Sequence, residues 1–124
     1  MVIPKKKILV VDDEPDLLKL VEWQLIMSGY DVLTALNGLE GLKKAREEKP
    51  DLIILDVVMP IRQMNGIQMN ESLKKDDLTK NIPVILFTST INSSEIIDEN
   101  EMVMFPKSIS SEKLLSKIRE LTSP

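Results

Sequence analysis

The chain has 124 residues, of which 43% are apolar and 29% charged, and 16 basic residues against 20 acidic ones give a net charge of −4. This length and composition are typical of one globular domain, so we expect a single domain over residues 1–124. The negative charge argues against direct nucleic-acid binding. No apolar run reaches the roughly 18 residues that span a bilayer, and no secretory signal is apparent, so we expect a cytoplasmic protein without membrane contact.

Two residue types that carry much protein chemistry are absent, because the sequence has no cysteine and no histidine. The lack of cysteine excludes disulfides, a thiol nucleophile and thiolate metal sites. The lack of histidine excludes Ser-His-Asp catalysis and the usual zinc sites. The chemistry that remains uses carboxylates, hydroxyls and lysine.

Five short runs rich in apolar and β-branched residues predict strands. They cover residues 8–11, 31–35, 52–56, 84–87 and 102–105. The run at 52–56 is apolar until its last residue, Asp56, which is typical of a strand buried inside a parallel sheet. We expect the run at 31–35 to be an edge strand.

Amphipathic stretches between these runs predict five helices. They begin at Pro15, after Asn37-Gly38, near Ile67, at Asn92 and at Ser110 or Ser111. Pro15 suits the first position of a helix, and the acids that precede it, up to Glu14, favour the helix dipole. Asn92 and Glu95 together resemble the capping box of a short helix.

The first predicted helix carries two apolar stripes. One stripe, formed by Leu17, Val21 and Leu25, predicts the face toward the core. The other is formed by Leu20, Trp23 and Met27. This second stripe indicates either a broad buried face or a docking surface around the only tryptophan.

The alternation of strands and helices predicts a doubly wound α/β domain, with helices on both faces of a parallel sheet and right-handed crossovers. In such sheets, ligands bind at the carboxyl ends of the strands. Polar residues follow four of the five predicted strands at that edge. They are Asp12, Asp13, Asp56, Thr88, Ser89 and Lys107.

The chemistry of these residues indicates a site for a divalent cation and a phosphoryl group. Clustered carboxylates repel one another unless a cation lies between them, and oxygen ligands without imidazole suit Mg²⁺. Lys107 and Thr88 can supply the charge and hydrogen bond that phosphoryl oxygens require. A carboxylate can itself act as nucleophile, and Asp56 is the best placed to do so.

Four segments carry a resemblance to a known family. They are Ile8–Glu14, Asp51–Pro60, Pro83–Ser89 and Lys107. With these segments the chain resembles the response-regulator receiver domains of two-component systems, such as the chemotaxis regulators, from Lys7 to Leu121. The resemblance implies a flavodoxin-like fold with strand order 2-1-3-4-5.

The resemblance also implies roles for the residues at the strand ends. Asp56 is the expected phosphoacceptor, and Asp12 and Asp13 are expected to hold Mg²⁺ with Asp56 and the backbone carbonyl of Val58. The expected residues for phosphate binding and switching are Thr88, Ser89 and Lys107. Because the chain lacks histidine, the donor is expected to be a histidine kinase or a histidine phosphotransfer protein. The domain is then a phosphorelay switch and not an enzyme, with an unknown downstream target and homodimer formation on phosphorylation as an option.

The chain departs from the family pattern around Lys107. Ser108 follows Lys107 where the family has proline, so we expect a trans bond between these two residues. Met104 occupies the place of the aromatic residue that couples to the switch hydroxyl, and Phe105 follows it, so either side chain is a candidate for switching. The span from Thr88 to Lys107 is short, which predicts a short or irregular fourth helix.

Two other functions stay open. One is a receiver-like interaction module that phosphorylation does not regulate. The other is a small phosphohydrolase with an aspartate nucleophile. That class places its nucleophile on the first strand in an Asp-x-Asp pattern, whereas Asp12 and Asp13 are adjacent.

Overall fold

A six-stranded sheet forms the middle layer of the molecule, in the order β2-β1-β3-β4-β6-β5. The computed structural model describes residues 5–57, 66–88, 96–97 and 103–123. The strands are β1 (Lys7–Val11), β2 (Asp31–Ala35), β3 (Leu52–Asp56), β4 (Val84–Thr88), β5 (Ile96–Ile97) and β6 (Val103–Pro106). Neighbouring strands are parallel except for β5, which pairs antiparallel with β6.

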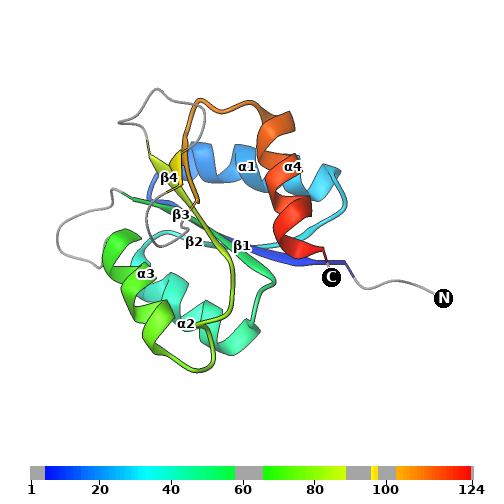
Figure 1. The fold of residues 1–124 in the computed structure, drawn as a ribbon. Helices are drawn as coiled ribbons and strands as arrows, with labels where there is room; N and C mark the ends of the chain where they lie inside the picture. The colour runs from blue at the N-terminus through cyan, green and yellow to red at the C-terminus, as the bar shows by residue number, and fades with distance from the viewer. Residues whose placement is uncertain (1–4, 58–65, 89–95, 98–102, 124) are drawn as a thin grey trace.

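Helices cover both faces of this sheet (Figure 1). They are α1 (Pro15–Met27), α2 (Gly38–Glu48), α3 (Gly66–Lys75) and α4 (Ser111–Thr122). One face packs against α1 and α4, and the other packs against α2 and α3. Among the helices that the structure describes, none combines the length and the apolar character of a membrane span.

The two apolar layers follow from the alternation of side chains along each strand. Ile8 and Val10 of β1 point toward α1 and α4, whereas Leu9 and Val11 point toward α2 and α3. The central strand β3 is buried along its whole length, Asp56 included. The sequence of β3 is therefore apolar from Leu52 to Leu55, as predicted for a strand covered on both faces.

The predicted fold class is confirmed. All five predicted strands are present, and the last of them is β6. Taken alone, these five strands are parallel and follow the order 2-1-3-4-5. The bond between Lys107 and Ser108 is trans, as is every peptide bond in the described ranges, Phe105–Pro106 included.

The prediction of a helix from Asn92 is wrong at Ile96–Ile97, and the described ranges contain four helices instead of five. Ile96 and Ile97 pair with Met104 and Val103 as the short strand β5. Two consecutive β-branched residues favour a strand, and their pairing covers part of the edge that β6 would otherwise expose. Asn92 and Glu95 themselves lie outside the described residues.

The interpretation of α1 as a helix with one broad buried face is also wrong. Val21 and Leu25 are buried as predicted, and Leu18 joins them. The second stripe faces outward, because 52% of Leu20, 61% of Trp23 and 69% of Met27 are exposed. Only one side of α1 packs against the sheet.

Caps define the starts of two helices. The side chain of Asn37 accepts a hydrogen bond from the backbone N–H of Glu40 at 2.8 Å, which begins α2. The hydroxyl of Ser110 accepts one from the N–H of Lys113 at 3.2 Å, so Ser110 and not Ser111 caps α4.

Candidate functional site

The predicted site residues meet at the carboxyl end of the sheet. Asp12 follows β1, Asp56 ends β3, Thr88 ends β4 and Lys107 follows β6. These four strands are consecutive neighbours in the sheet, so their ends lie side by side. Thr88, Asp12 and Asp56 are all buried. Val58 and Ser89, which were also predicted to belong to the site, lie outside the described residues.

Four carboxylates form a cluster at this edge. One oxygen from each of Asp12, Asp13, Glu14 and Asp56 lies within 4.8 Å of the others. Three of these residues were predicted as metal ligands, and Glu14 was not. An all-oxygen set without imidazole or thiolate suits a hard divalent cation, and Mg²⁺ uses one or two carboxylates together with water. The donor set therefore fits the predicted Mg²⁺.

Lys107 neutralises part of this negative charge. Its Nζ lies 2.9 Å from Glu14 Oε1, 3.1 Å from Asp12 Oδ2 and 3.3 Å from Asp56 Oδ2. Burial by itself lowers the pKa of Lys107, but hydrogen bonds to Glu14 and Asp12 and the charges of Asp12 and Asp56 raise its pKa above the ordinary value. The ammonium therefore keeps its charge at neutral pH.

Backbone hydrogen bonds fix the positions of these side chains. The N–H of Asp12 donates to the carbonyl of Ala35 at 3.1 Å, which ties the residue after β1 to the end of β2. Asp12 Oδ1 accepts from the N–H of Glu14 at 2.9 Å, so this carboxylate has a defined direction. The N–H of Lys107 donates to the carbonyl of Thr88 at 2.8 Å, which extends the pairing of β4 and β6 to the site.

Gly66 packs directly on the backbone of the predicted phosphoacceptor. A Cβ on Gly66 would lie 2.0 Å from the carbonyl oxygen of Asp56 and 2.8 Å from the Cα of Val57. The N–H of Gly66 also donates to the carbonyl of Val57 at 3.3 Å. The start of α3 therefore fits against the end of β3 only with glycine at this position. The sequence pattern did not indicate this contact.

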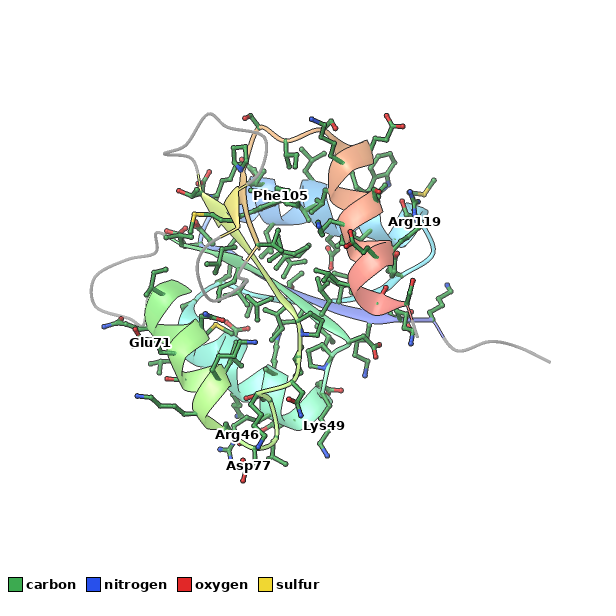
Figure 2. All side chains as sticks on the ribbon, in the orientation of Figure 1. Arg46, Lys49, Glu71, Asp77, Phe105 and Arg119 are labelled. Carbon is green, nitrogen blue, oxygen red and sulfur yellow. The ribbon has the colours of Figure 1, made fainter. Side chains whose placement is uncertain are left out.

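Met104 and Phe105 lie on opposite faces of β6. Phe105 is buried in the cluster that includes α1 and α4 (Figure 2), whereas Met104 is partly buried against the α2 and α3 side. In β4, Val84 and Leu86 face α2 and α3. By strand alternation, Thr88 points to that same face. Met104 therefore shares a face of the sheet with Thr88, and Phe105 does not.

Comparisons with known proteins agree with this arrangement. Residues 8–119 match the family model of the response regulator receiver domain. The alkaline phosphatase synthesis transcriptional regulatory protein PhoP of Bacillus subtilis is 48% identical over 84 residues, which cover 68% of this chain and 33% of PhoP. The transcriptional regulator RpaA of Synechocystis is 33% identical over 118 residues, which cover 93% of this chain and 48% of RpaA. This chain thus spans less than half the length of either relative.

A solved structure gives the same result for the fold. The chemotaxis protein CheY4 of Vibrio cholerae superposes with a TM-score of 0.81 at 27% identity, over 95% of this chain and 99% of CheY4. The family match over residues 8–119 and the superposition on CheY4 both cover nearly the whole chain. The chain belongs to the response regulator receiver domain family.

Proposed function

We propose that this chain is a phosphoacceptor switch in a two-component phosphorelay, with Asp56 as the residue that receives the phosphoryl group. Receiver domains are signalling domains. The observation that carries the proposal is the position of Asp56. It is a buried carboxylate at the end of the central strand, inside an acidic cluster and 3.3 Å from the ammonium of Lys107.

The proposed reaction transfers a phosphoryl group from a phosphohistidine of another protein. An oxygen of Asp56 forms a bond to phosphorus, and the bond between phosphorus and the imidazole nitrogen breaks. The electron pair of that bond stays on the imidazole, which takes up a proton from solvent. Phosphoryl transfer depends on positioning of the reacting groups and on charge stabilisation. The ammonium of Lys107 would offset the charge on the phosphoryl oxygens.

Asp12, Asp13 and Asp56, together with the backbone carbonyl of Val58, would hold Mg²⁺ in this proposal. The ion would offset negative charge on the phosphoryl oxygens. Hydrogen bonds within the protein fix the directions of these carboxylates. For Asp12, the N–H of Glu14 donates this hydrogen bond. Carboxylates held in this way need less rearrangement to bind the ion.

Switching would follow from the new charge on Asp56. The hydroxyls of Thr88 and Ser89 are the proposed groups that turn toward the phosphoryl group, and the segment after β4 would shift with them between two pre-existing states. Met104 is the better candidate for coupling to Thr88, because the two side chains share a face of the sheet.

The proposed donor is a histidine kinase or a histidine phosphotransfer protein, since this chain contains no histidine. One relative is the hybrid signal transduction histidine kinase D of Dictyostelium discoideum, which is 33% identical over 120 residues that cover 94% of this chain and 8% of the kinase. A cytoplasmic location and homodimer formation on phosphorylation belong to the same proposal.

Binding of beryllofluoride, a phosphoryl mimic, tests the proposal. We expect a saturable Mg²⁺-dependent change in the amide NMR spectrum and in the fluorescence of Trp23. The change should disappear in Asp56→Asn and persist in Asp31→Asn, which removes an exposed carboxylate from the start of β2. If neither the NMR spectrum nor the fluorescence changes, the result would contradict the proposal. It would favour the interaction module that phosphorylation does not regulate.

A further inference from the structure

Glu14 makes a contact at the site that its position in the sequence does not explain. It precedes α1, where an acid commonly favours the helix dipole, yet its side chain makes no capping hydrogen bond. Instead, Glu14 Oε1 lies 2.9 Å from Lys107 Nζ, which is the shortest of the three distances from that ammonium to a carboxylate. The two residues are 93 positions apart in the chain.

The number of donors on Lys107 limits what it can bind. A lysine ammonium has three N–H groups. Three carboxylates, those of Asp12, Glu14 and Asp56, lie within ion-pair distance of it. Lys107 donates hydrogen bonds to Glu14 and Asp12, so a phosphoryl group on Asp56 adds oxygen acceptors that compete with these two carboxylates for the same N–H groups.

Glu14 is the carboxylate that can release the ammonium most easily. The side chains of Asp12 and Asp56 are only 5% and 2% exposed, so loss of a positive partner would leave a buried charge poorly compensated. The side chain of Glu14 is 62% exposed, so water can replace Lys107 around it. The ion pair between Glu14 and Lys107 is thus the exchangeable one.

We propose that Glu14 is a positioning residue that holds Lys107 in the unphosphorylated protein and competes with the phosphoryl group for its ammonium. This inference rests on the proposed function, since it assigns a role within the same site. Glu14 favours the unphosphorylated state, because its contact with Lys107 weakens when the phosphoryl oxygens draw on the same ammonium.

The test compares the affinity for beryllofluoride at saturating Mg²⁺ in the wild type and in Glu14→Gln. Glutamine keeps the size of the side chain and removes the charge. Asp16→Asn is the matched control, because Asp16 is an exposed acid in the first turn of α1. The Mg²⁺ affinity of each variant is measured first without the mimic, so that saturation holds for all of them.

We expect Glu14→Gln to bind beryllofluoride about two- to fivefold more tightly than the wild type, the effect expected of one partly exposed ion pair. Asp16→Asn should change the affinity by less than half as much. In a Lys107→Ala background, Glu14→Gln should give no gain, because the ammonium for which Glu14 competes is gone.

Three results would overturn the inference. They are no gain in Glu14→Gln, an equal gain in Asp16→Asn, and a gain that persists in the Lys107→Ala background. If Lys107→Ala binds no mimic at all, the comparison of Glu14→Gln with Asp16→Asn decides alone. A wild-type protein that binds no mimic would instead refute the proposed function itself, so the two failures are distinguishable.

Discussion

Gly66 and Asp56 are in direct backbone contact, so close that a Cβ on Gly66 would lie 2.0 Å from the carbonyl oxygen of Asp56. The start of α3 and the end of β3 therefore fix each other's position. In the proposed phosphotransfer, the carboxylate of Asp56 gains from this rigid support, because small displacements of a reacting group reduce rates strongly.

Gly66→Ala should lower both stability and phosphoryl-mimic binding. The clash is with backbone atoms, which cannot move aside as a flexible side chain can, so we expect a loss of about 2–3 kcal/mol in the free energy of unfolding. Urea unfolding and beryllofluoride titration measure the two effects. The control is Gly29→Ala, where φ is 97° and no atom lies within 4 Å of the added Cβ. It should lose stability through backbone strain and keep its affinity for the mimic.

Lys107→Ala should make the protein depend on Mg²⁺ for stability. Removal of the ammonium leaves the carboxylates of Asp12 and Asp56 close together in a buried site, which should cost about 3 kcal/mol without the cation. Urea unfolding with and without Mg²⁺ measures this dependence. The ion should restore more stability to Lys107→Ala than it adds to the wild type. Equal stabilisation of the two proteins would show that Lys107 does not neutralise the cluster.

Lys107 should contribute to the free energy of unfolding at neutral and mildly alkaline pH. Its pKa is higher in the folded state than the ordinary lysine value of about 10.4, so its contribution is complete below that pH and is lost as pH rises through the folded pKa. The difference in unfolding free energy between the wild type and Lys107→Ala should therefore stay constant from about pH 7 to 9. A steep fall of this difference within that range would contradict the ion-pair geometry.

The two faces of α1 should respond differently to substitution. Trp23→Gln should change the unfolding free energy by less than about 0.5 kcal/mol, because Trp23 is mostly exposed. Leu25→Ala should cost about 2–5 kcal/mol, because Leu25 is 1% exposed in the core. Urea unfolding of both variants checks the expectation. A large loss of unfolding free energy in Trp23→Gln would contradict the outward orientation of this side chain.

The sequence could predict which residues reach the site, because strand ends are visible in the pattern. Asp12, Asp56, Thr88 and Lys107 each stand at the end of an apolar run, and parallel strands bring such ends to one edge. The pattern could not predict which carboxylates Lys107 would contact. Its contact with Glu14 joins segments 93 residues apart and depends on the directions of two side chains.

The errors in the predicted fold have physical reasons of the same kind. Apolar residues lie nearly all around α1, so periodicity alone could not tell that Leu20, Trp23 and Met27 face outward. Asn92 with Glu95 suggested a helix, but the pairing of Ile96–Ile97 with β6 depends on an open sheet edge that local sequence does not reveal.

The most direct test of the central claim is chemical phosphorylation of the protein with phosphoramidate, a small donor with a phosphorus–nitrogen bond, followed by intact-mass and peptide mass spectrometry. In the presence of Mg²⁺ we expect one phosphoryl group per chain, located on Asp56 and removed by hydroxylamine, as an acyl phosphate should be. Asp56→Asn should remain unmodified and Asp31→Asn should react like the wild type. No modification of the wild type, or equal modification of Asp56→Asn, would contradict the assignment of Asp56 as the phosphoacceptor.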